Sequence, residues 1–313
     1  MNNFEELKKL ISNTPLIEIR YKYNNTERKA IIKCEWYSLT GSIKDKVAYQ
    51  IFKDAYESGH LHKGDKVVEV SSGNMGISVA AMGNLLGNPV TILMPKNMSE
   101  ERKKLIRLYG ANLIETDNFV SAFDTCKRFV ESGYFCTEQF KNSSNTQAHK
   151  DITAREIIDK SHLFHADCFV AGIGTSGTLS GVGRELKSRL GLNVIAIEPT
   201  NSRIISSPPP YGHHELQGLS DEILPDLFDR TLVDDVIQIS DDDAIAMARK
   251  LCGELSLGVG ISSGANFLGA VLSEKNAISI FPEDNKKYLS TRLSNTITTP
   301  LVDSIELIDY HVI

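Results

Sequence analysis

Lys44 is the first residue whose type and surroundings suggest chemistry. It lies in the segment GSIKDK, residues 41–46, where a glycine-bearing loop enters a helical pattern. A lysine held in an apolar cleft has a lowered pKa and can act as a nucleophile or a base. Because most lysines are exposed, this segment taken alone is more typical of a solvated surface lysine.

Three later segments place glycine and small polar residues between a strand pattern and a helix pattern. They are residues 69–76 (EVSSGNMG), 172–178 (GIGTSGT) and 260–266 (GISSGAN). Backbone N–H groups at a helix start bind anions, and glycine lets the backbone approach a phosphate closely. The alternatives are a helix N-cap made by Ser72 or Asn74 in the first segment and a close-packed helix start in the third.

The segment 172–178 also satisfies the GxGxxG pattern of dinucleotide-binding proteins. Glu198 ends the next strand pattern, about where an acidic residue would bind the ribose of a nicotinamide cofactor. An NAD-dependent dehydrogenase is therefore an alternative that these residues leave open.

The elements around these segments alternate between strand and helix patterns. From residue 65, apolar runs such as DKVVEV and PVTILMP alternate with helical patterns, and the order βαβαβ predicts a parallel sheet. Ser99 and Gly110 provide a start and a stop signal for one helix. A second α/β unit begins with DCFVAGIG near residue 168, so we expect two lobes, with a long irregular connection around the prolines at 208–210.

Taken together and in this order, the four segments resemble the β-family of pyridoxal-phosphate enzymes, which contains cysteine synthase and cystathionine β-synthase. The resemblance extends from Asn13-Thr14-Pro15-Leu16 to the KYLST segment at 287–291. It implies an α/β fold of two three-layer αβα lobes with mostly parallel twisted sheets, the fold-type II, tryptophan synthase β-like architecture. We expect a smaller lobe of residues 33–146 and a larger lobe of residues 11–32 and 147–313.

The resemblance also implies roles for individual residues. Lys44 would hold pyridoxal 5'-phosphate as a Schiff base and act as the base at Cα. Asn74 would contact the cofactor's ring oxygen and Ser262 its pyridine nitrogen. The cofactor phosphate would be bound by Gly174, Thr175, Ser176, Gly177 and Thr178. The substrate α-carboxylate would be bound by Ser71, Ser72, Gly73 and Gln139.

The family's commonest reaction is β-replacement through an aminoacrylate intermediate, with O-acetyl-L-serine and sulfide giving L-cysteine and acetate. A neutral serine at the pyridine nitrogen does not enforce its protonation, which favours prompt β-elimination. The partners implied are a small amino-acid substrate and sulfide or a thiol, and the family implies a homodimer.

Three departures from the family pattern concern the substrate pocket. Ser38-Leu39 stand where Asn-Pro is usual, and Met75 replaces a threonine. Residues 218–222 read GLSDE, where the family generally has a neutral glycine-rich stretch. If Asp221 faces the cleft, it could act as a general base and suit an enzyme that takes cysteine, releases sulfide and forms serine or lanthionine. The alternative is that Asp221 and Glu222 are solvated loop carboxylates.

Composition excludes several other classes of protein. The 34 lysines and arginines against 40 aspartates and glutamates give a net charge of −6 without a basic run, so no nucleic-acid or membrane partner is expected. Without an apolar signal segment, the protein should be cytoplasmic. The five cysteines form no CxxC pair and the histidines no ligand spacing, so we expect buried reduced thiols and no metal site.

Overall fold

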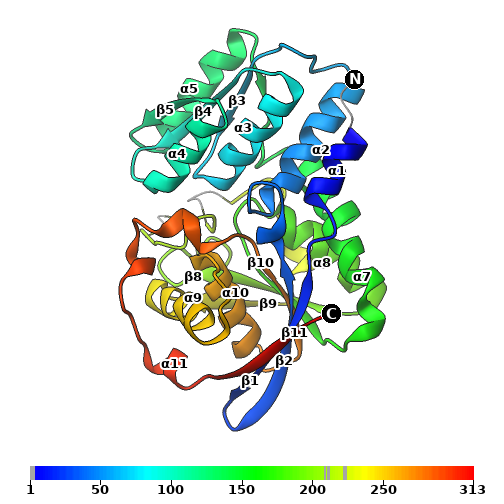
Figure 1. Ribbon diagram of the computed structural model, residues 1–313, viewed down its shortest axis with the longest axis vertical. Helices are drawn as coiled ribbons and strands as arrows, with labels where there is room; N and C mark the ends of the chain where they lie inside the picture. The colour runs from blue at the N-terminus through cyan, green and yellow to red at the C-terminus, as the bar shows by residue number, and fades with distance from the viewer. Residues whose placement is uncertain (1–3, 208, 210–211, 221–223) are drawn as a thin grey trace.

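The computed structural model describes residues 4–207, 209, 212–220 and 224–313. Within these ranges the chain forms one sheet of four strands and one of seven, each lying between layers of helices (Figure 1). This is the predicted two-lobed α/β fold with mostly parallel sheets. The lobe boundaries at residues 33 and 146 stay a prediction.

The four-stranded sheet of the smaller lobe is parallel throughout, in the order β5-β4-β3-β6. Its side chains alternate between two helical layers, as strand geometry requires: Val67 and Ile92 pack towards α2 and α3, and Val68 and Leu93 towards α5. The elements are β3 (Val67–Val70), β4 (Val90–Pro95), β5 (Asn112–Thr116), β6 (Phe135–Cys136), α2 (Lys44–Glu57), α3 (Asn74–Leu86), α4 (Glu100–Leu108) and α5 (Phe119–Glu131).

The seven-stranded sheet of the larger lobe is mixed, in the order β11-β1-β2-β10-β7-β8-β9. Its antiparallel edge joins the first two strands of the chain to the last one. The strands are β1 (Leu16–Tyr23), β2 (Thr26–Cys34), β7 (Cys168–Gly172), β8 (Asn193–Pro199), β9 (Asp235–Ile239), β10 (Ala277–Phe281) and β11 (Glu306–Val312). The remaining helices are α1 (Phe4–Ile11), α6 (Ser144–Ala148), α7 (Arg155–Asp159), α8 (Gly177–Leu190), α9 (Asp241–Leu255), α10 (Ile261–Leu272) and α11 (Pro300–Asp303).

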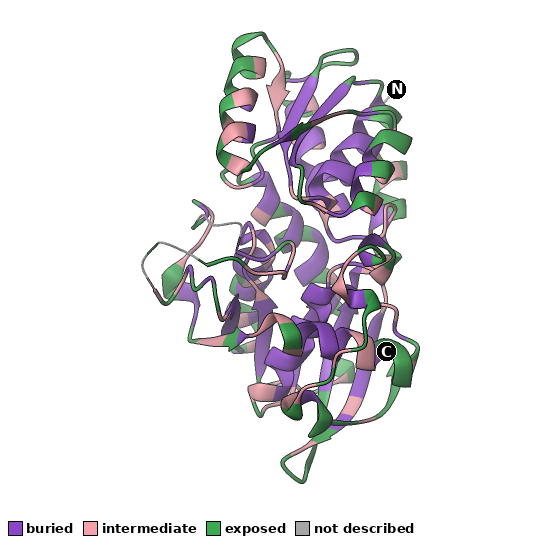
Figure 2. Cartoon of the chain, turned by 90° about the vertical axis from the view of Figure 1, so that its left-hand side faces the viewer, coloured by how far each residue is buried: buried purple, intermediate pink, exposed green. Residues whose placement is uncertain are grey.

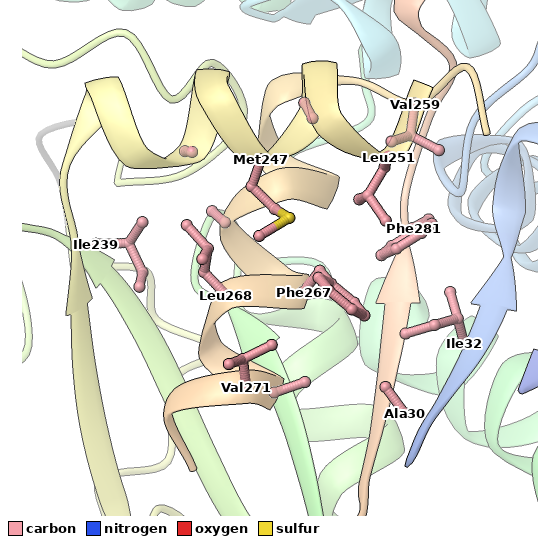
Figure 3. Close-up of a cluster of buried hydrophobic side chains, with 14 of the residues drawn as sticks. Ala30, Ile32, Ile239, Met247, Leu251, Val259, Phe267, Leu268, Val271 and Phe281 are labelled. Atoms are coloured by element: carbon pink, nitrogen blue, oxygen red, sulfur yellow. The ribbon is translucent and has the colours of Figure 1, made fainter. Parts of the chain in front are cut away.

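Helices cover both faces of the larger sheet. On one face, α9 and α10 pack on the strands through Met247, Leu251 and Phe267, which meet Phe281 and Ile32 (Figure 3). On the other face, α7 and α8 cover the alternate strand residues. Figure 2 shows buried residues concentrated in the strands and the inner helices, so each sheet lies at the centre of its own core.

The predicted βαβαβ order and the second α/β unit are confirmed, including the helix between Ser99 and Gly110. Between β8 and β9 the described residues contain one short 3₁₀ turn, Arg230–Leu232, as expected for an irregular connection. All five cysteines are free, but Cys252 is exposed, so the expectation of uniformly buried thiols is wrong there. No helix among the described residues is long and apolar enough to cross a membrane.

Candidate active site

One cavity collects the residues that the sequence singled out. It is lined by Lys44, by residues of the loops that follow β3 and β7, and by Ser262. In a parallel sheet these loops follow the carboxyl ends of the strands, where α/β proteins place their binding sites. Within the described chain, every predicted site residue except Gly73 lines this cavity.

Lys44 is the first residue of α2, and Asp45 fixes the loop that leads to it. The Asp45 carboxylate accepts hydrogen bonds from the backbone N–H and the hydroxyl of Thr40, at 2.7 and 2.6 Å, and from Ser78 at 2.7 Å. Gly41, in the same loop, has a φ of 78° and accepts a hydrogen bond from Lys287 through its carbonyl. The position of Lys44 therefore depends on contacts from both lobes.

The loop after β3 turns sharply into α3 and is held by Ser71. The Ser71 hydroxyl accepts hydrogen bonds from the N–H groups of Gly73 and Gly76, at 3.0 and 2.9 Å. Ser71 thus accepts the hydrogen bonds from N–H groups at this helix start. The sequence-based alternative had given this role to Ser72 or Asn74. A Cβ at Gly73 would lie 2.2 Å from Cδ of Arg102, so only glycine fits against this side chain.

Gln139 lines the cavity, but its amide nitrogen is directed into the protein. Its Nε2 donates to Oε1 of Glu69 at 2.8 Å and to the carbonyl of Val70 at 3.0 Å. Both amide protons are therefore already used. The predicted role of Gln139 at the substrate carboxylate stays a prediction, and in this conformation only the amide oxygen remains for a ligand.

Glu69 lies in β3 beneath this site and was not singled out by the sequence. Its carboxylate is buried and accepts hydrogen bonds from Thr137 and Gln139. Burial raises the pKa of Glu69 well above its ordinary value, although these two hydrogen bonds lower it. The folded protein therefore keeps the Glu69 carboxyl group protonated to a higher pH than an exposed glutamate would be.

Replacing Glu69 with glutamine is expected to raise the free energy of unfolding at neutral pH. The folded-state pKa lies above the unfolded one, near 4, so between the two values the folded protein binds more protons and wild-type stability falls as pH rises. Glutamine carries no charge at any of these pH values. The variant therefore lacks the fall in the free energy of unfolding that ionisation of Glu69 causes. Urea unfolding at successive pH values measures the slope. Glu131→Gln, an exposed change on α5, is the control, and a Glu69→Gln protein less stable than wild type at neutral pH would contradict the assignment.

The loop between β7 and α8 is tightly packed and directs a helix start towards the cavity. A Cβ at Gly174 would lie 2.2 Å from the carbonyl oxygen of Gly218, and one at Gly177 would lie 1.9 Å from Oδ1 of Asn145. Asn145 also donates to the Thr175 hydroxyl at 2.9 Å. The N–H groups of the first turn of α8 belong to a fourteen-residue helix and so form an anion-binding end.

Several buried polar atoms of residues that line this cavity have no partner within the described chain. They include Oδ1 of Asn74 and Oγ of Ser262, together with Oε1 of Gln217 and Nε and Nη1 of Arg102. Because buried polar atoms are nearly always hydrogen-bonded, unpaired ones facing a cavity indicate a ligand with polar groups at these positions.

Two sequence-based proposals receive no support from this geometry. Glu198 is fully buried and accepts hydrogen bonds from the backbone N–H groups of Ile205 and Ser206, so it has no role as a ribose-binding acid. Asp221 and Glu222 lie outside the described residues. Gly218 and Leu219, just before them, line the cavity.

Sequence reasoning missed Arg102 and Glu283, which also line the cavity. Arg102 belongs to a run of basic residues in α4, and nothing in its sequence context separates it from Lys103, Lys104 or Arg107. Glu283 lies just after β10, about 180 positions away in the chain. Only the packing of the two lobes brings this pair together.

Comparisons with known proteins agree with this site. The family model described as pyridoxal-phosphate dependent enzyme matches residues 7–285. The chain is 33% identical to a cysteine synthase of Staphylococcus aureus over 92% of this chain and 96% of that protein. It is 36% identical to cysteine synthase B of Campylobacter jejuni, over 94% and 99%.

Among solved structures, a hydrogen sulfide-producing enzyme from Fusobacterium nucleatum superposes with a TM-score of 0.94. The two sequences are 40% identical, and the match covers 99% of this chain and 98% of that one.

Proposed function

The chain belongs to the pyridoxal-phosphate dependent enzyme family and binds that cofactor, and from this premise we propose that it makes L-cysteine. The reaction class is β-replacement on a β-substituted L-amino acid. In the proposed reaction, hydrosulfide replaces the acetate group of O-acetyl-L-serine, so that L-cysteine and acetate are formed with no change in oxidation state. The cysteine synthases among its relatives support this choice of substrates.

The residues of the cavity fit the cofactor. We propose that Lys44 binds its aldehyde, that Asn74 and Ser262 pair with its ring oxygen and ring nitrogen, and that residues 174–178 hold its phosphate. The observation that carries this proposal is that two unpaired buried oxygens on different lobes, Asn74 Oδ1 and Ser262 Oγ, share one cavity with Lys44 and the first turn of α8. When bound, pyridoxal phosphate delocalises the electron pair that is left at the substrate Cα.

The chain's own groups then perform the proton transfer and positioning. The Lys44 amine removes the proton from Cα and later returns one to the same carbon. The loop from Ser71 to Gly73 holds the α-carboxylate at the start of α3, where the helix N-terminus favours an anion. Ser262 contributes a neutral hydroxyl, which leaves the ring nitrogen without an enforced proton.

A spectrum and two turnover assays test this function. The purified protein should show the visible absorbance of lysine-bound cofactor, and O-acetyl-L-serine with sulfide should give L-cysteine. If L-cysteine alone is consumed with release of sulfide while O-acetyl-L-serine is inert, cysteine synthesis is the wrong direction. Without a visible band after added cofactor, the proposal fails altogether.

A second candidate reaction consumes cysteine, releases hydrogen sulfide, and forms serine with water or lanthionine with a second cysteine. The similarity to a hydrogen sulfide-producing enzyme supports it, as does the pair Asp221-Glu222 in a segment that is neutral in most of the family. We propose Asp221 as the general base that activates water or a thiol in this reaction.

Replacing Asp221 with asparagine tests this candidate. If Asp221 is the base, sulfide release from cysteine should fall by about a hundredfold or more, while turnover of O-acetyl-L-serine with sulfide changes little. Asp226→Asn, in the exposed part of the same connection, is the control. Unchanged sulfide release from cysteine would remove Asp221 from the mechanism.

We also propose that the protein forms a homodimer, as the family resemblance implies, and that it acts in the cytoplasm. Light scattering of the purified protein at several concentrations tests the dimer.

A further inference from the structure

Arg102 lies at the inner edge of the smaller lobe, against the loop that leads into α3. Figure 1 shows its helix, α4, on the side of the smaller lobe that faces the larger one. The side chain is 2% exposed, lines the same cavity as Lys44, and occupies the space that a Cβ at Gly73 would need. It is therefore a buried cation beside the proposed carboxylate-binding loop.

The protein satisfies only part of this guanidinium. Its Nη2 donates to both oxygens of Glu283, at 3.3 and 3.2 Å, and its central carbon lies 4.5 Å from the ring centre of Tyr288. Its Nε and Nη1 atoms have no hydrogen-bond partner within the described part of the chain. Because an unpaired buried donor costs free energy, these atoms indicate a missing acceptor.

The guanidinium stays charged in this environment. Burial lowers the pKa of Arg102, but Tyr288 and Glu283 outweigh that effect and the net direction is upward. Lys44 and Arg102 are the basic side chains that line the cavity in the described chain. With Lys44 committed to the cofactor, Arg102 remains as the cation available to an anionic group.

The neighbouring donors are partly used. Both amide protons of Gln139 are bonded to Glu69 and Val70, and the N–H of Gly73 is bonded to the Ser71 hydroxyl. A substrate α-carboxylate at this loop therefore lacks some of the donors that the family resemblance assigns to it. The unpaired Nε–H group of Arg102 lies beside the same glycine.

We propose that Arg102 binds the α-carboxylate of the amino-acid substrate through its unpaired Nε–H group, which lies beside Gly73. This inference rests on the proposed function, because it needs an amino acid at the Ser71–Gly73 loop. In this arrangement Glu283 orients the guanidinium through Nη2, and Tyr288 supports its face. Substrate binding then supplies an acceptor to a buried donor of the arginine.

The competing role for Arg102 is purely structural. Arg102 and Glu283 join the smaller lobe to the segment after β10, and Ser99 at the start of α4 donates to the carbonyl of Lys287 at 2.8 Å. An ion pair that only fastens the lobes would lose its effect when either partner is removed. Carboxylate binding instead requires Arg102 itself, because Glu283 occupies only Nη2 and leaves Nε–H unpaired.

The test measures the binding of L-alanine and of L-alaninamide to the holoenzyme. The change in cofactor absorbance reports the binding of each probe. The two probes share an amine and a side chain without a leaving group, but only L-alanine carries a carboxylate. Arg102→Met should reduce the preference for L-alanine over L-alaninamide by about tenfold or more, as expected for a lost hydrogen bond to a charged group. The matched control Arg107→Met removes an exposed arginine from the same helix and should leave the preference unchanged.

Glu283→Gln separates binding from a structural role, because it removes the ion pair between the lobes but keeps Arg102 and an amide oxygen as acceptor for Nη2. It should keep or increase the preference for L-alanine, whereas equal weakening of both probes in both variants would overturn the proposal. If Arg102→Met fails to retain cofactor, Arg102→Gln is measured instead, and an unchanged preference there also overturns it. Because L-alanine has no leaving group, the result is independent of whether β-replacement is found.

Discussion

Replacing Lys44 with alanine is expected to lower turnover by about a thousandfold or more and to abolish the visible absorbance of the bound cofactor. The variant removes the amine that we propose as both the attachment point of the cofactor and the base at the substrate Cα. Asn74, Ser262 and residues 174–178 remain, so the protein should still bind pyridoxal phosphate without a covalent bond. Steady-state assays and dialysis against cofactor-free buffer measure the two effects.

Lys53→Ala is the control for this experiment. Lys53 lies on the same helix, α2, and pairs with the exposed Glu57 at 3.4 Å, away from the cavity. Turnover and absorbance should both stay close to the wild-type values. Substantial turnover by Lys44→Ala would mean that another amine performs the chemistry, and the assignment of this site would fail.

Replacing Lys46 with methionine is expected to destabilise the protein by about 3–5 kcal/mol. Lys46 lies two residues after Lys44, fully buried, and its Nζ is 2.7 Å from Oε1 of Glu35 and 3.2 Å from Oε2 of Glu156. Methionine fills a similar volume but leaves the buried Glu35 without its paired ammonium group, and the Thr14 hydroxyl at 2.8 Å remains as a hydrogen-bond donor to it. A buried carboxylate without a cation is costly, because the protein interior solvates charge poorly.

A double variant isolates the charge as the cause. Lys46→Met combined with Glu35→Leu removes both ions and leaves the Lys33–Glu156 pair, at 2.6 Å, in place. It should recover much of the lost stability, since replacing a buried pair by apolar residues is often neutral. Lys53→Met, which breaks an exposed pair, should cost about 0.5 kcal/mol or less in the same urea unfolding experiment. A loss below about 1 kcal/mol for Lys46→Met would contradict the account.

The buried cluster around Lys46 also explains how the start of α2 is held. Lys46 belongs to α2, Glu35 follows β2, and Glu156 belongs to α7. The cluster therefore ties the helix that carries Lys44 to the larger lobe, whose Ser262 and α8 contribute the remaining cavity residues. The position of the reactive lysine is consequently sensitive to contacts that are far away in sequence.

Some of this could be predicted because it depends on local patterns. Strands β3, β4 and β7 are buried on both faces and appear as apolar runs, and small polar residues follow β3 and β7. These two loops follow the carboxyl ends of strands in different sheets, so the packing of the two lobes brings them to one cavity. The antiparallel strands β1, β2 and β11 were not predicted, because β11 is largely exposed and pairs with residues near the other end of the chain.

The sequence by itself determined the α/β order and many of the residues that line the cavity, because each belongs to a short segment with a local pattern. The cofactor class followed from the resemblance that these segments carry together. Only the tertiary structure decided what Gln139, Glu69 and Arg102 face. Gln139 turns its amide protons inward because Glu69 lies beneath it, and Arg102 enters the cavity because Glu283 meets it from the other lobe. Burial and pairing across long sequence separations set these orientations, and no local pattern encodes them.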